Sequence, residues 1–140
     1  MTTTTARATP ISARGYSQTF PCVPESAGLA RDLVTTALRA WHLETQLNEA
    51  ALVATELVAN AVQHGSGHYL VFSVERPAHS RVRIHVTDQS CIQPTLRSPD
   101  EEETKGRGLL LVSVLSVGWG TDVHTSGKTV WAELMDEAGT

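Results

Sequence analysis

The stretch AALVATELVANAVQHG, from Ala50 to Gly65, organises the chain because it reads as one amphipathic helix. At about 100° per residue, one arc of this helix carries only apolar side chains, which predicts a face packed against the core. Glu56 and Asn60 lie one turn apart on the margin of that arc. The helix is expected to end at Gly65, a residue suited to a left-handed C-terminal cap. The apolar arc consists of Leu47, Ala50, Ala54, Leu57, Val58 and Ala61.

Asn60 is an unfavourable residue inside a helix, since its amide competes with the backbone for hydrogen bonds at a cost of about 0.5 kcal/mol relative to alanine. A carboxylate and an amide oxygen one turn apart can polarise a hydroxyl group and ligate a hard cation. Phosphoryl transfer from a nucleotide needs both the polarised hydroxyl group and the bound cation. The alternatives are a solvated carboxylate for Glu56 and an amide hydrogen-bonded to a neighbouring loop for Asn60.

Length and composition predict a single domain at residues 15–137. The chain has 140 residues and is 41% hydrophobic, which is enough for one core. Residues 1–14 are threonine-rich and are expected to form a mobile tail. The net charge of -4 argues against nucleic acid and anionic membranes as partners. No apolar run reaches the roughly 18 residues of a membrane span, and no secretory signal is seen, so a cytoplasmic location with reduced Cys22 and Cys91 is expected.

The remaining periodicities predict helices and strands in a defined order. Two pairs of alternating segments indicate β-hairpins, and a long polar segment at 89–105 separates them. This order predicts an α+β two-layer sandwich, with helices on one face of a mixed, mostly antiparallel sheet. The expected elements are an edge strand at 16–23, helices at 27–41 and 50–65, strands at 69–75 and 81–87, a helix opening on Gly106 and Gly108, and strands at 119–125 and 129–134.

Four segments in order carry a family resemblance: ELVANAVQHG (56–65), VTDQS (86–90), GRGLLLV (106–112), and WG (119–120) with GKTVWAEL (127–134). With them the chain resembles the GHKL superfamily of Bergerat-fold ATPases and kinases, and within it the small bacterial anti-sigma-factor serine kinases. The resemblance extends from Gln18 to Leu134. It implies the Bergerat ATP-binding fold, with ATP and Mg²⁺ as cofactors.

The resemblance also implies roles for individual residues. Asn60 ligates Mg²⁺ through its side-chain oxygen, and Glu56 is the general base that deprotonates a serine hydroxyl. Asp88 accepts the exocyclic amino hydrogen of adenine, and Thr129 supports the same edge of the base. The alternatives are a turn-forming aspartate and a strand-favouring threonine. The implied nucleotide-binding residues are Asn60, His64, Asp88, Gly106, Arg107, Gly108, Leu109 and Thr129.

Two glycine boxes are expected to contact the nucleotide. Gly106, Arg107 and Gly108 resemble the second box, where backbone N–H groups at a helix start meet the phosphates. Arg107 either contacts a phosphate or is solvated. The first box should read DxGxG, whereas the segment 88–92 reads DQSCI and lacks both glycines. This departure puts the close backbone approach that glycine permits in doubt. The acidic run at 100–103 is expected in the lid over the phosphates.

The implied function is that of an ATP-dependent protein serine kinase and anti-sigma factor. Its partners are then a sigma factor and an anti-sigma-antagonist protein that it phosphorylates, and the family typically works as a homodimer. An alternative from another class is a nucleotide-binding partner switch that sequesters a regulatory protein without phosphoryl transfer, which the altered glycine box favours. A third is an α/β scaffold without a ligand.

Overall fold

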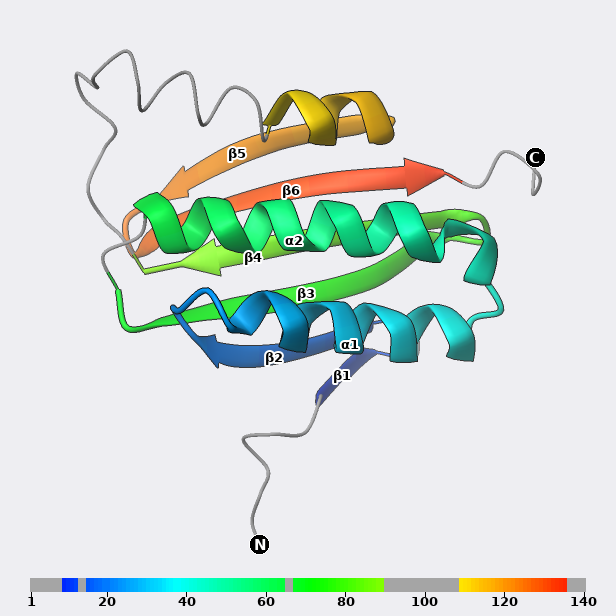
Figure 1. Cartoon of the computed structure of the whole chain (residues 1–140), viewed down its shortest axis with the longest axis horizontal. Coiled ribbons are helices and arrows are strands. Elements are labelled where there is room, and N and C mark those ends of the chain that lie inside the picture. The colour runs from blue at the N-terminus through cyan, green and yellow to red at the C-terminus, as the bar shows by residue number, and fades with distance from the viewer. Residues whose placement is uncertain (1–8, 13–14, 65–66, 90–108, 136–140) are drawn as a thin grey trace, which may run out of the picture.

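The fold is a six-stranded antiparallel sheet covered on one face by helices, seen in a computed structural model that describes residues 9–12, 15–64, 67–89 and 109–135 (Figure 1). The strands lie in the order β1-β2-β3-β4-β6-β5. Their bounds are β1 (Thr9–Ser12), β2 (Gly15–Pro21), β3 (Tyr69–Ala78), β4 (Arg81–Asp88), β5 (Gly118–His124) and β6 (Gly127–Met135). The helices are α1 (Ser26–Ala40), the 3-10 helix η2 (Glu44–Gln46) and α2 (Leu47–His64), and residues 109–115 are also helical.

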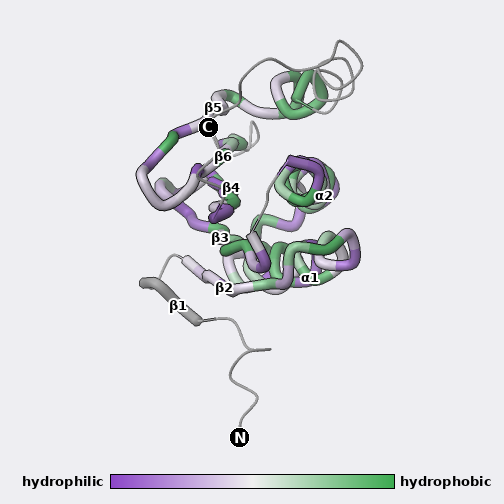
Figure 2. Tube along the Cα trace, turned by 90° about the vertical axis from the view of Figure 1, so that its left-hand side faces the viewer, coloured by the Kyte–Doolittle hydropathy of each residue, from purple (hydrophilic) through white to green (hydrophobic). Residues whose placement is uncertain are grey.

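The two layers are seen edge-on in Figure 2, where α1 and α2 lie on the same side of the strands. The predicted α+β two-layer architecture is therefore confirmed. The sequence predicts a mixed, mostly antiparallel sheet. The five strand pairings of the described sheet are all antiparallel, so the sheet is not mixed. Hairpins account for this result, because three of the five pairings join strands that follow each other along the chain through short turns.

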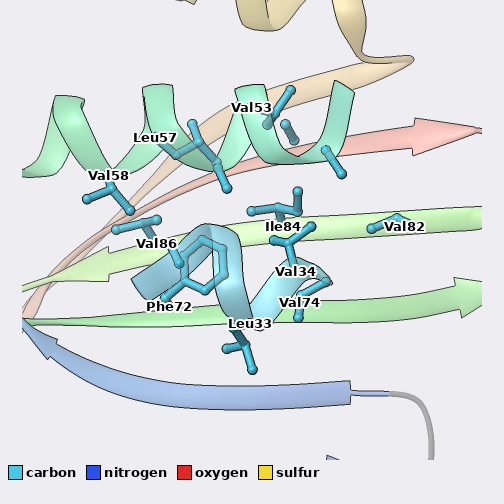
Figure 3. Packing of buried hydrophobic residues seen from close by; sticks show 14 of the residues in the cluster. Leu33, Val34, Val53, Leu57, Val58, Phe72, Val74, Val82, Ile84 and Val86 are labelled. Carbon is cyan, nitrogen blue, oxygen red and sulfur yellow. The ribbon is translucent and has the colours of Figure 1, made fainter. Parts of the chain in front are cut away.

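The core lies between α2, α1 and the central strands. On β4, Val82, Ile84 and Val86 are fully or almost fully buried, whereas the residues between them are only half-buried on the other face. Figure 3 shows Val86 and Ile84 next to Val58 and Leu57 of α2, with Val82 further along β4 in the same core cluster. The alternation along β4 therefore fixes which face of the sheet receives the helices.

The apolar arc predicted for α2 is confirmed. Its alanines, Leu57 and Val58 are buried, and Leu47 packs partly against the same cluster. Val53 adds a further fully buried side chain. The helix is preceded by η2, so the polypeptide enters it through one tighter helical turn.

Strand β1 lies inside the segment expected to be a mobile tail. Thr9 pairs with Ser17 and Pro10 with Tyr16, so β2 has a neighbour on both sides and is not the edge strand that the sequence analysis expects. Pairing between strands is made by the backbone, so a segment with few large apolar residues can still extend a sheet. Proline is tolerated here because β1 is itself an edge strand.

Several predicted features lie outside the described residues. They are Gly65, the expected lid with its acidic run, and Gly106, Arg107 and Gly108. Within the described part of the chain, no helix is long and apolar enough to cross a membrane.

Candidate functional site

The orientation of α2 decides where Glu56 and Asn60 lie. The Arg31 guanidinium of α1 donates a hydrogen bond to the Thr55 hydroxyl at 3.1 Å, so the Thr55 flank of α2 faces α1. At about 100° per residue, Glu56 and Asn60 fall on the other flank. Glu49, two turns earlier on that flank, lines a cavity together with residues of the 109–115 helix. The flank with Glu56 and Asn60 therefore faces the side of the 109–115 helix.

Asn60 is the polar residue of α2 that is most enclosed by its surroundings. It is 9% exposed, and no other described residue hydrogen-bonds to its side chain. A buried amide without a protein partner is costly, so its donors and acceptor are available for water, an ion or a ligand. Glu56 is half-buried one turn before it. The predicted pair thus lies on one rim of the helix.

Asp88 ends β4 on the helix-facing side of the sheet. It follows Val82, Ile84 and Val86 at the same alternate spacing and is only 2% exposed. Leu70 of β3 is its cross-strand neighbour on one side. A carboxylate at this depth needs polar partners, since burying an unpaired polar group is costly. Asp88 is therefore placed as a fixed hydrogen-bond acceptor under the helices.

Cys22 shows that Asp88 and the Asn60 turn of α2 are neighbours. Its thiol lies 3.7 Å from the backbone oxygen of Ala61, the residue after Asn60. Burial raises the pKa of the Cys22 thiol, and the negative charge of Asp88 raises it further. The Cys22 side chain thus contacts α2 and is close enough to the end of β4 for the charge of Asp88 to act on it. Cys22 is a free cysteine in the described part of the chain, and Cys91 lies outside it.

Figure 1 shows the same arrangement at the level of the elements. The end of α2, the arrowhead of β4 and the start of β6 lie at one end of the molecule, on the left of that view. The elements that carry Asn60 and Asp88 therefore meet at one end of the domain.

Gly127 brings the β5–β6 turn against Asp88. Its φ is +153°, a conformation that residues with a side chain rarely adopt. A Cβ atom added there would overlap the backbone oxygen of Asp88. The turn can therefore close on the end of β4 only because position 127 is glycine. The sequence pattern predicts a turn at this residue but does not indicate its contact with Asp88.

Lys128, and not Thr129, shares the face of Asp88. Lys128 pairs directly with Asp88 across the β4–β6 ladder and is 6% exposed. Thr129 points to the opposite face, where its hydroxyl lies 2.8 Å from that of Thr87 and 2.9 Å from Nε2 of His124. The structure thus corrects the expectation that Thr129 supports the same edge of adenine as Asp88. A shift of one residue along a strand reverses the face, and Lys128 has the buried parity.

The other predicted residues are placed only in part. His64 is the last residue of α2 and is half-buried, and Leu109 is the half-buried first residue of the described 109–115 helix. Both belong to elements that border the site, while the second glycine box between them lies outside the described residues.

The residues present fit a magnesium nucleotide. Mg²⁺ prefers oxygen ligands and is commonly held by one or two protein groups together with phosphate oxygens and water. The amide oxygen of Asn60 meets that need, because no described residue occupies it. Asp88 offers a buried acceptor for an amino group. The donor set therefore suits a nucleotide held at both ends.

Comparison with known families agrees with this geometry. The model of a histidine kinase-like ATPase domain matches residues 20–134. This range includes α1, α2, strands β3 to β5 and nearly all of β6. No curated protein matches the chain at a significant level.

Proposed function

Since the chain belongs to the histidine kinase-like ATPase domain family, we propose that it binds ATP between α2 and the end of β4 and phosphorylates a serine of a partner protein. One observation supports this most. The buried carboxylate of Asp88 and the buried amide of Asn60 border the same region, from two different elements. Both are polar groups enclosed where apolar side chains would pack, and the side chain of Asn60 has no hydrogen-bond partner among the described residues.

Three described residues have separate roles in the proposed phosphoryl transfer. Asp88 accepts a hydrogen bond from the exocyclic amine of adenine, and Asn60 ligates Mg²⁺ through its amide oxygen. Glu56 accepts the proton of the serine hydroxyl, because a half-buried carboxylate one turn from the metal ligand can reach the attacking group. Bound ATP supplies the γ-phosphoryl group.

The partner proteins are proposed from the resemblance of the four ordered segments. The phosphorylated protein is an anti-sigma-antagonist, and the second partner is a sigma factor whose release depends on the nucleotide state. The active form is proposed to be a homodimer. These assignments make the chain a regulator of transcription that acts without contacting nucleic acid, in line with its net charge of -4.

A second candidate function is a partner switch that binds ATP without phosphoryl transfer. The sequence DQSCI at 88–92 favours it, because the two missing glycines remove positions where the backbone can approach a ligand closely. In this case Glu56 is a solvated helix carboxylate and its replacement changes nothing.

The test combines nucleotide binding with transfer. Thermal unfolding with ATP and Mg²⁺ should show stabilisation of about 3 kcal/mol at a hundredfold excess over Kd. Asn60→Ala should weaken Mg²⁺-dependent binding at least about tenfold. Its matched control is Asn48→Ala, which removes an exposed amide from the start of the same helix.

Transfer of labelled phosphate to an antagonist protein is then measured with Glu56→Gln. Its matched control is Glu44→Gln, which removes an exposed carboxylate of η2. A loss of about a hundredfold or more in Glu56→Gln alone supports the kinase. Binding without transfer in the wild type supports the switch. Absence of any ATP-dependent stabilisation removes both proposals.

A further inference from the structure

The cavity lined by Glu49 lies at the opposite end of α2 from Asn60. It has a volume of about 390 Å³ and is enclosed by η2, the start of α2, the end of the 109–115 helix and the end of β6. Figure 1 shows these segments on the right, away from the end of β4. We name it the Gln46 cavity, after the residue that supplies its most buried polar group. It takes no part in the proposed nucleotide site.

Gln46 leaves a hydrogen-bond acceptor unused in this region. The residue is 4% exposed, and its Oε1 atom is buried without a hydrogen-bond partner among the described residues. Its Nε2 atom faces the backbone oxygen of Ser80 at 3.4 Å. That carbonyl can only accept, so the amide nitrogen must face Ser80 and Oε1 is left with nothing to accept from. Buried polar atoms without partners are rare and call for an explanation.

The charge around the cavity selects a cation. Glu49 places an exposed carboxylate at its margin, so an anion would be repelled. The first N–H groups of α2 carry a partial positive charge, which the full charge of Glu49 exceeds. Leu115, Val117 and Leu134 supply apolar patches in a lining that is otherwise mostly polar. The cavity therefore combines these apolar patches with acceptors and a negative charge.

We infer that the Gln46 cavity binds a guanidinium or ammonium group carried on an apolar stem. The head group donates hydrogen bonds to the Glu49 carboxylate and to Oε1 of Gln46, whose side chain must shift to expose this buried atom, while the stem contacts the apolar patches of the lining. The group can come from a small organic amine or from an arginine or lysine side chain of a protein. Val114 and Val117 at the margin are 72% and 56% exposed, so a polypeptide would gain further apolar contacts there.

Binding is measured by amide chemical-shift changes in the full-length protein titrated with n-butylguanidinium. The expected result is a saturable change confined to η2, the start of α2 and residues 115–117. The neutral analogue n-butylurea should bind at least about threefold more weakly. Glu49→Gln should weaken n-butylguanidinium binding by a similar factor. Glu44→Gln, which removes an exposed carboxylate of η2 that does not line the cavity, should leave it unchanged.

Gln46→Met tests the acceptor itself, since methionine keeps the volume and removes the amide. Weaker binding in this variant, with thermal unfolding still cooperative, supports the inference. Equal affinity of n-butylguanidinium for the wild type and Glu49→Gln overturns it, as does the absence of saturable shifts at the cavity. The outcome is independent of ATP binding, which is measured separately on the same samples.

The capped peptide Leu-Arg-Leu distinguishes the two sources. If the natural ligand is a polypeptide, this peptide should bind more tightly than n-butylguanidinium and also shift the amides of Val114 and Val117. If the natural ligand is a small amine, the two should bind equally. A peptide and an amine that both fail to shift the cavity residues contradict the site.

Discussion

Replacing Gly127 by alanine should destabilise the protein and displace Asp88. The new methyl group would overlap the backbone oxygen of Asp88, a rigid neighbour that cannot rotate away. At a φ of +153°, alanine also adopts a strained backbone conformation. Strain of this kind costs about 1–3 kcal/mol, and forcing an extra methyl into packed structure costs a further 1–3 kcal/mol. The expected loss in the free energy of unfolding is about 3 kcal/mol.

That loss corresponds to a Tm lowered by roughly 12 °C, at about 4 °C per kcal/mol for a domain of this size. It is below the stability of most domains, so the variant should still fold. The ATP Kd should also rise about tenfold if Asp88 moves with its backbone. Thermal unfolding with and without ATP measures both effects on one sample.

Gly28→Ala provides the matched control, because it makes the same substitution inside α1. A Cβ atom at position 28 would meet only the end of the Arg31 side chain, at 3.6 Å. Alanine favours a helix over glycine by about 0.5–1 kcal/mol, so the Tm should stay or rise. A Gly127→Ala protein whose Tm lies within about 2 °C of the wild type would refute the argument that the turn needs glycine to close on Asp88.

Three further changes test other parts of the structure. Leu57→Ala should lower the free energy of unfolding by about 2–5 kcal/mol in urea titrations, because Leu57 is fully buried, whereas Leu52→Ala on the exposed side of α2 should cost at most about 0.5 kcal/mol. Burial lowers the pKa of His85 from 6.5. As pH decreases, the unfolded chain binds a proton at His85 before the folded protein does, so the free energy of unfolding should fall below about pH 6.5. His85→Gln should reduce this dependence of the free energy of unfolding on pH. An equal pH dependence in the wild type and the variant would contradict the prediction. Lys128→Met should change the ATP Kd by about tenfold and Thr129→Val by less than twofold in calorimetric titrations, and the reverse order would place the wrong residue beside Asp88.

Periodicity alone predicts most of the fold. The apolar arc of α2 and the alternation along β4 both report burial directly, so the side of each element that meets the core follows from the sequence. Strand β1 could not be found this way. Its pairing with β2 uses backbone groups, which every residue has, and residues 9–12 show no apolar alternation.

The site is predictable only where a side chain is out of place in its local pattern. Asn60 inside a helix and Asp88 at the buried parity of a strand are both such residues, and the structure brings their surroundings together. Thr129 and Lys128 show the limit. Their faces depend on the register between β4 and β6, two strands far apart in the sequence, so no hairpin turn between them fixes that register.

The missing glycines after Asp88 and the presence of Gly127 bear on the same physical requirement. A nucleotide site at the end of a strand needs backbone without Cβ atoms nearby, so that neighbouring segments can approach closely. In this chain Gln89 follows Asp88 and is exposed, while the segment that does approach is the turn of the adjacent hairpin. The close approach at Asp88 is thus made from β6, across the ladder, rather than along β4. For that reason the altered glycine box does not by itself exclude nucleotide binding. Replacing Gly127 should show whether Asp88 binds the adenine base.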